Sequence, residues 1–203
     1  MKKQFFQNIK RKINEFSFLY SEIFTYEHLL DSKENVSLIK SFFVDKQSGK
    51  GLEIYLKDYA AFDEESNNNK TFLVKDKFSN EIAGYFSLKT GLITVQINDD
   101  YFDSIPAIEL SNFAVNSDYK QKHVETKAIG RNIFINFVLP LVNKIREDIA
   151  INAIYIYALP EPSLISYYKT MGFVRLDKKE EEFVYNHVKP KYDEDCIFMY
   201  QSL

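Results

Sequence analysis

The side chains that could do chemistry gather between residues 105 and 173. The apolar strand pattern Ala107–Val115 carries one carboxylate, Glu109. Partial burial raises the pKa of a carboxylic acid, so a glutamate in such a strand can accept a proton from a substrate. Further along, Gly130 falls in the first turn of an amphipathic helix that follows a polar loop. A helix start binds anions, because its first N–H groups lack intrahelical partners and carry the positive end of the dipole.

Hydrophobic spacing predicts the elements that must position these side chains. Helices are expected at Glu34–Phe43, Leu52–Phe62, Ala128–Asp148 and Ser163–Met171, and strands around Ser21–Leu29 and at Thr71–Lys75, Ile82–Leu88, Ala107–Val115, Ala153–Ala158, Phe173–Leu176 and Cys196–Gln201. Pro140 predicts a kink within the long helix, and Asn98–Ser104 a solvated connection. The alternation indicates an α/β (α+β) chain with a mixed sheet and one domain over residues 1–203.

An N-terminal helical extension is predicted over residues 1–20. Phe5, Ile9, Ile13 and Phe16 recur at close to helical spacing with Lys and Arg between them. Packing on the domain or on a partner is the preferred interpretation, and a membrane-surface helix is the alternative.

Composition restricts the function classes. With 203 residues, 45% hydrophobic and 27% charged, the chain reads as a globular protein, and its net charge of −3 gives no general attraction to nucleic acid. Cys196 is the single cysteine, so an internal disulfide is excluded, and with three scattered histidines a zinc cluster is not expected. No run approaches the roughly 20 apolar residues that span a bilayer. We therefore expect a cytoplasmic protein without a membrane or metal partner.

The order of these parts resembles the cofactor-binding half of the GNAT acyltransferase superfamily. In that superfamily a Gln or Arg, then a Gly, then a Gly or Ala mark the loop that cradles the pyrophosphate of acetyl-CoA. The matching positions are Glu125, Ala128 and Gly130, of which only Gly130 fits cleanly. The resemblance implies that acetyl-CoA is the cofactor and that its binding residues are Phe113, Ala114, Val115, Lys122, Lys127, Ala128, Ile129, Gly130, Arg131 and Ser163.

The same resemblance implies two catalytic residues. Glu109 lies where the histone-acetylating branch carries its general base, although a strand glutamate paired with a lysine or facing solvent is an equal alternative. Tyr168, four residues before Gly172-Phe173, lies where the superfamily has a tyrosine that protonates the leaving thiolate. An asparagine is usual seven residues before that tyrosine, and here the position is Glu161.

The N-terminal half resembles the GNAT subfamily that includes aminoacyl-tRNA-acetylating toxins. The matching segments are FFVDKQSGKGLEIYLKDYAA, NKTFLVKD and EIAGYFSLKTGLITV. The implied function is acetyl transfer to a primary amine of a small molecule or peptide in a ternary complex. A toxin-like acetyltransferase of aminoacyl-tRNA is a second hypothesis, which an isoelectric point of 5.7 does not favour. A non-catalytic acyl-CoA- or protein-binding module is a third. A homodimer is left open.

Overall fold

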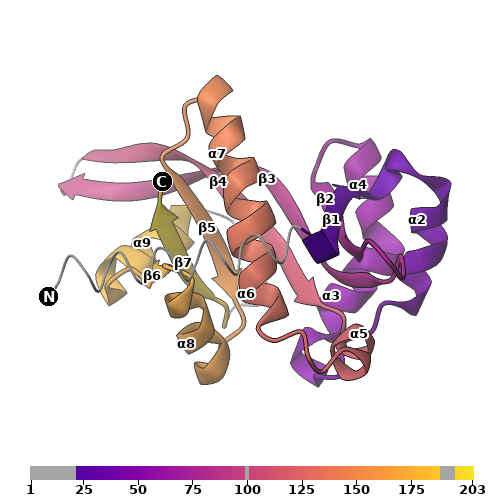
Figure 1. Ribbon diagram of the computed structural model, residues 1–203. Coiled ribbons are helices and arrows are strands. Elements are labelled where there is room, and N and C mark those ends of the chain that lie inside the picture. Colours follow the sequence, from indigo (N-terminus) through magenta and orange to yellow (C-terminus); the bar gives the residue numbers. More distant parts are fainter. Residues whose placement is uncertain (1–21, 99–100, 188–194) are drawn as a thin grey trace, which may run out of the picture.

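One seven-stranded mixed sheet organises the protein. The computed structural model describes residues 22–98, 101–187 and 195–203 (Figure 1), so the predicted N-terminal helix lies outside the described residues. From edge to edge the strands are β1 (Phe24–His28), β2 (Lys70–Asp76), β3 (Ile82–Asn98), β4 (Tyr101–Val115), β5 (Ala153–Ala158), β7 (Ile197–Ser202) and β6 (Val174–Arg175). The β4–β5 pair is parallel and the other neighbours are antiparallel. The predicted mixed α/β fold is confirmed.

The hairpin of β3 and β4 is longer than the sequence predicts. Residues expected to form a solvated connection, Asn98–Ser104, belong largely to the strands, because β4 already begins at Tyr101. The ring of Phe102 lies 6.2 Å from that of Phe183 on α9 (Lys178–His187), and Val95 and Ile105 pack beneath that helix. These apolar contacts extend the ladder beyond the polar residues that suggested a loop.

Two groups of helices cover the sheet (Figure 1). The N-terminal group comprises α2 (Lys33–Leu38), α3 (Lys50–Ile54), the π-helical turn η4 (Tyr55–Tyr59) and α4 (Ala60–Glu65). Its core is built on Leu29, Phe42, Leu56 and Tyr85, all fully buried. On the opposite face, Phe134, Val138, Val142 and further apolar residues of the long helix pack against the strands. Among the described residues, no helix is long and apolar enough to cross a membrane.

The long helix is continuous from Ile129 to Asp148 but not uniform. It consists of α6 (Ile129–Ile133), the π-helical turn η5 (Phe134–Val138) and α7 (Leu139–Asp148). Pro140 falls in the first turn of α7, where its missing N–H and its ring are accommodated just after the wider turn. The irregularity predicted at the proline therefore takes the form of a π-helical turn that precedes it.

The centre of the sheet opens where β4 and β5 diverge. Their pairing covers only Ala107–Glu109 opposite Ala153–Tyr155. In the β3–β4 pairing, Ser87 is opposite Asn112 and Leu88 is opposite Leu110, so Ser111 is an extra residue in β4. This β-bulge is held by the Ser111 hydroxyl, which donates to Asn69 Oδ1 at 2.7 Å. A bulge bends its strand and increases the twist, which fits the separation of β4 from β5.

Candidate acyl-CoA cleft

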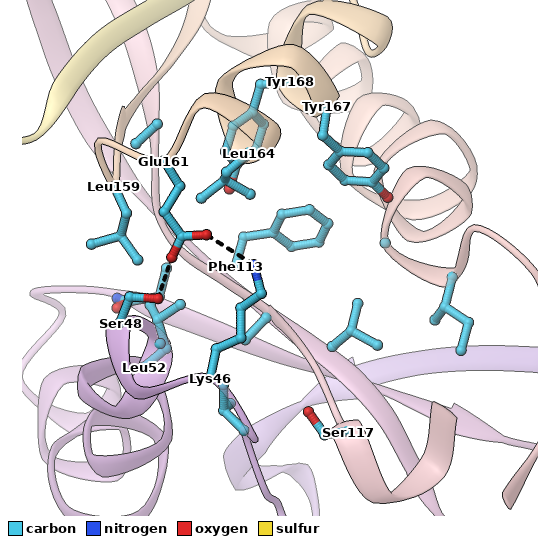
Figure 2. A pocket seen from close by; sticks show the side chains of 18 of the residues that line it. Lys46, Ser48, Leu52, Phe113, Ser117, Leu159, Glu161, Leu164, Tyr167 and Tyr168 are labelled. Atoms are coloured by element: carbon cyan, nitrogen blue, oxygen red, sulfur yellow. Dashed lines mark hydrogen bonds and ion pairs between the residues drawn. The ribbon is translucent and has the colours of Figure 1, made fainter. Parts of the chain in front are cut away.

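A cavity of about 1270 Å³ lies between the diverging strands. Its wall combines β4 from Leu110 to Val115, the end of β5, the segment Val44–Leu52, the start of the long helix, and α8 (Pro162–Thr170). Figure 2 shows side chains from these elements pointing into one space. In the described part of the chain, no group of three or more His, Cys, Asp or Glu side chains could hold a metal ion.

The start of the long helix forms one end of the cavity. Ala128 precedes the helix in the left-handed conformation, with φ of 54°, and the first helical bond joins Asn132 N to Ala128 O at 3.0 Å. The backbone N–H groups of Ile129, Gly130 and Arg131 precede that bond and so have no acceptor within the helix. A Cβ on Gly130 would lie 2.9 Å from the Tyr167 hydroxyl and 3.2 Å from Val115 Cγ2. A side chain at this position would therefore crowd Tyr167 and Val115, where the helix, the strand and α8 approach closely.

Contacts among neighbouring side chains hold the loop before this helix. Lys122 Nζ lies 2.7 Å from Glu81 Oε1, and His123 Nε2 lies 3.2 Å from Glu81 Oε2. The His123 ring also stacks on Tyr119, with ring centroids 4.1 Å apart. Glu81, in the turn before β3, thus holds the loop in place. The hydrogen bond from Lys122 and then that from His123 lower the pKa of Glu81.

The structure brings many of the predicted cofactor residues together. Phe113, Ala114, Val115, Lys127, Ala128, Ile129 and Gly130 lie on the cavity wall. Three others do not: Lys122, Arg131 and Ser163, each of which is exposed. A helix places successive side chains about 100° apart, so Arg131 is turned away although its backbone is in the first turn.

Tyr168 contributes a buried phenol to the cavity. Its side chain is 8% exposed, and Figure 2 shows its hydroxyl directed toward Leu164 inside the cavity. Phe173 supports the ring edge-on, with centroids 5.8 Å apart. Burial, followed by the proximity of Tyr167, raises the pKa of Tyr168 above its ordinary value. The phenol is therefore neutral at physiological pH.

Glu109 lies behind the wall instead of on it. The Glu109 side chain is 6% exposed; its carboxylate accepts a hydrogen bond of 2.9 Å from the Tyr155 hydroxyl at Oε2 and lies 3.2 Å from Lys89 Nζ at Oε1. The lysine pairing is the alternative that the sequence left open. Tyr157, which lines the cavity, packs edge-on against Tyr155 with ring centroids 6.0 Å apart. Burial and then the charge of Glu109 raise the Tyr157 pKa.

Glu161, unlike Glu109, lies on the cavity wall. Its Oε2 lies 2.9 Å from Lys46 Nζ, and its Oε1 accepts a hydrogen bond from the Ser48 hydroxyl (Figure 2). These two residues lie on the segment between Phe42 and α3, on the other side of the cavity. The contact therefore connects the N-terminal helices with the start of α8.

Solved structures similar to this chain share its fold, whereas no known family's sequence model matches it. A tyrosine-to-phenylalanine mutant of the toxin AtaT, bound to the C-terminus of the antitoxin AtaR and acetyl-CoA, is 14% identical; the match covers 88% of this chain and 92% of that chain, with a TM-score of 0.62. A tyrosine-to-phenylalanine mutant of KacT is 12% identical over 89% and 95%, with a TM-score of 0.62. The chain has the GNAT fold. AtaT complexed with acetyl-methionyl-tRNAfMet matches at 14% identity over 86% and 93%, with a TM-score of 0.59.

Within the GNAT fold, several wall residues are not found by the sequence pattern. These are Lys46, Ser48, Tyr157, Leu159 and Leu164. Two signals could have pointed to some of them. Tyr157 shares a strand face with Ala153 and Tyr155, and Leu164 lies between Glu161 and Tyr168 on one helix face. No local signal marks Lys46 and Ser48, because they meet Glu161 over 115 and 113 residues of sequence.

Proposed function

We propose that the chain is an acetyl-CoA-dependent N-acetyltransferase that acetylates a primary amine within a ternary complex. The observation that carries the proposal is the convergence of three features on one cavity: the helix start at Gly130, the open edge of β4, and the phenol of Tyr168. Acyl transfer from a thioester to an amine requires an anion site, oxyanion donors and a proton donor, which these features can supply.

The cavity fits the cofactor at the helix start. The absence of a side chain at Gly130 leaves the backbone accessible where a Cβ would crowd Tyr167 and Val115. Lys120 and Lys127 lie on the same wall and offer positive charge to phosphate groups. When bound, acetyl-CoA supplies an activated acetyl group as a thioester. The backbone of Phe113 to Val115 would hold the pantetheine arm by strand-like pairing.

The chain's own residues then have distinct roles. Backbone N–H groups of β4 near Ala114 and Val115 would donate hydrogen bonds to the thioester carbonyl oxygen and so polarise the carbonyl. When the amine displaces the thiolate, Tyr168 would give its phenolic proton to the sulfur. Glu109 accepts the proton of the amine through an intermediary such as Tyr157 or a water, because its carboxylate does not reach the wall.

Replacement of Tyr168 tests this mechanism. Tyr168→Phe should lower acetyl transfer by about 10²- to 10⁴-fold, the usual contribution of a positioned acid, and leave acetyl-CoA affinity nearly unchanged. The measurement is release of free thiol from acetyl-CoA over a panel of primary amines, peptides and aminoacyl-tRNA. Tyr167→Phe is the matched control with the same chemical change on the neighbouring residue. Equal loss of turnover and cofactor affinity in Tyr168→Phe would make this tyrosine structural.

A toxin-like activity on aminoacyl-tRNA is the second candidate. The similar structure of AtaT holds acetyl-methionyl-tRNAfMet, and four lysines lie on the wall of the present cavity against two acids: Lys46, Lys50, Lys120 and Lys127 against Asp45 and Glu161. Expression of the active chain would then arrest growth, and Tyr168→Phe would relieve the arrest. Normal growth with soluble active protein would contradict this second candidate.

A further inference from the structure

The ammonium group of Lys46 is paired with the carboxylate of Glu161 on the cavity wall. Lys46 Nζ lies 2.9 Å from Glu161 Oε2, while the Ser48 hydroxyl donates to Glu161 Oε1 (Figure 2). A lysine side chain ends in a primary ammonium, which is the chemical class of the proposed acceptor. The protein's own residue thus shows that a primary ammonium fits this position.

The Glu161 side chain lies on the wall of the same cavity as the phenol of Tyr168. It immediately precedes α8, and Leu164 and Tyr168 follow it by three and seven residues, spacings that place all three on one helix face. All three belong to the cavity wall, and Figure 2 shows them pointing into it together. A group bound at Glu161 would therefore lie in the cavity that holds the Tyr168 hydroxyl.

The segment that carries Lys46 and Ser48 is held by the two residues that precede Lys46. The backbone N–H of Val44 donates to Glu53 Oε2 at 2.9 Å, and that of Asp45 donates to Ser117 Oγ at 3.1 Å. The Lys46 side chain itself is 65% exposed. Its ammonium can therefore move into solvent without disturbing the backbone, since a surface ion pair contributes little to stability.

The charge of Glu161 suits binding better than proton abstraction. Hydrogen bonds from Lys46 and then from Ser48 lower the pKa of Glu161, so the carboxylate is ionised at neutral pH. The other acid of the described wall, Asp45, accepts a hydrogen bond of 3.0 Å from the Ser117 hydroxyl. An ionised carboxylate with a lowered pKa attracts a cation and is a weak base.

We infer that the Glu161 carboxylate binds the ammonium group of the acceptor and that Lys46 occupies this site in the free protein. The inference rests on the proposed function and names a binding residue for its acceptor. Lys46 acts as a placeholder that an incoming primary ammonium displaces. Removing the placeholder should therefore strengthen ammonium binding, and removing the carboxylate should abolish the preference for a cation.

A titration with n-butylammonium, and with n-butanol as the uncharged probe of similar size, tests the site. Carbon-13 methyl signals of Leu159 and Leu164, both on the wall, report binding at constant ionic strength. Lys46→Met should bind butylammonium about two- to fivefold more tightly than the wild type, the range of an exposed ion pair. In the Lys46→Met protein, the further change Glu161→Gln should remove the preference for butylammonium over butanol. The matched change Asp45→Asn in the same protein should leave that preference intact.

Three results would overturn the inference: no gain in Lys46→Met, a preference for the cation that survives Glu161→Gln, or loss of that preference in Asp45→Asn. A parallel acetyl-CoA titration separates this inference from the proposed function. If acetyl-CoA does not bind, the proposed transferase function is contradicted, and the ammonium titration still tests the site at Glu161. Cofactor binding without any dependence on Glu161 contradicts only the ammonium site.

Discussion

The Tyr155 hydroxyl donates a hydrogen bond of 2.9 Å to Glu109 Oε2 inside the sheet, just where the parallel pairing of β4 and β5 ends. Both residues are buried, and Lys89 from β3 lies on the other carboxylate oxygen. The pair therefore sits behind the cavity wall at the point from which the two strands diverge.

Gly91 makes room for this arrangement. A Cβ at that position would collide with the Tyr155 hydroxyl and ring. Gly91→Ala should reduce the free energy of unfolding by about 1–3 kcal/mol, as overpacking in a core does, measured by urea denaturation. Gly51→Ala is the matched control, because its Cβ would meet nothing within 4 Å on helix α3. If Gly91→Ala leaves the urea midpoint unchanged, the Tyr155 hydroxyl is not held beside Gly91.

Ala128 carries strain that glycine would release. It adopts the left-handed conformation just before the long helix, a conformation that costs an L-residue about 1–2 kcal/mol. After the larger unfolded-state entropy of glycine is subtracted, Ala128→Gly should raise the free energy of unfolding by about 0.5–1 kcal/mol. The same change at Ala61, within helix α4, should lower it by a similar amount. Destabilisation by Ala128→Gly would contradict the assigned conformation.

Glu53 should make the stability of the protein depend on pH in the acid range. Burial opposes ionisation, but hydrogen bonds from Lys57, the Val44 amide and Lys50 outweigh it and lower the Glu53 pKa from 4.5 to about 2. Because the folded-state value lies below the unfolded one, the stabilisation is complete above about pH 4.5 and is lost as the pH falls toward 2. Between pH 6 and 2.5, the melting temperature of Glu53→Gln should fall less than that of the wild type. An equal fall in both proteins would contradict the lowered pKa of Glu53.

The sequence predicts the regular parts of the molecule because their patterns are local. The apolar run AIYIYA predicts β5 with the bounds that the structure has. The far half of β3 was missed because Lys89, Thr90 and Gly91 interrupt the apolar pattern. Two of those interruptions have long-range causes: Lys89 lies opposite Glu109, and Gly91 accommodates Tyr155.

The candidate site was predictable where backbone geometry decides it. Gly130 and Tyr168 are recognised from their spacing to neighbouring elements, and both lie on the cavity wall. Which of the two glutamates, Glu109 or Glu161, lies on the cavity wall was not predictable. Whether a carboxylate faces the cavity depends on partners from distant segments, Lys89 for Glu109 and Lys46 for Glu161.

Calorimetric titration with acetyl-CoA tests the central claim that the cavity is an acyl-CoA site. The wild type should bind, Tyr168→Phe should bind within about twofold, and Gly130→Asp should lose at least about tenfold, because its side chain would place bulk and negative charge at the helix start. Thermal melting of each variant checks that it is folded. Absence of binding by the folded wild type at millimolar acetyl-CoA, or full binding by Gly130→Asp, would contradict the account.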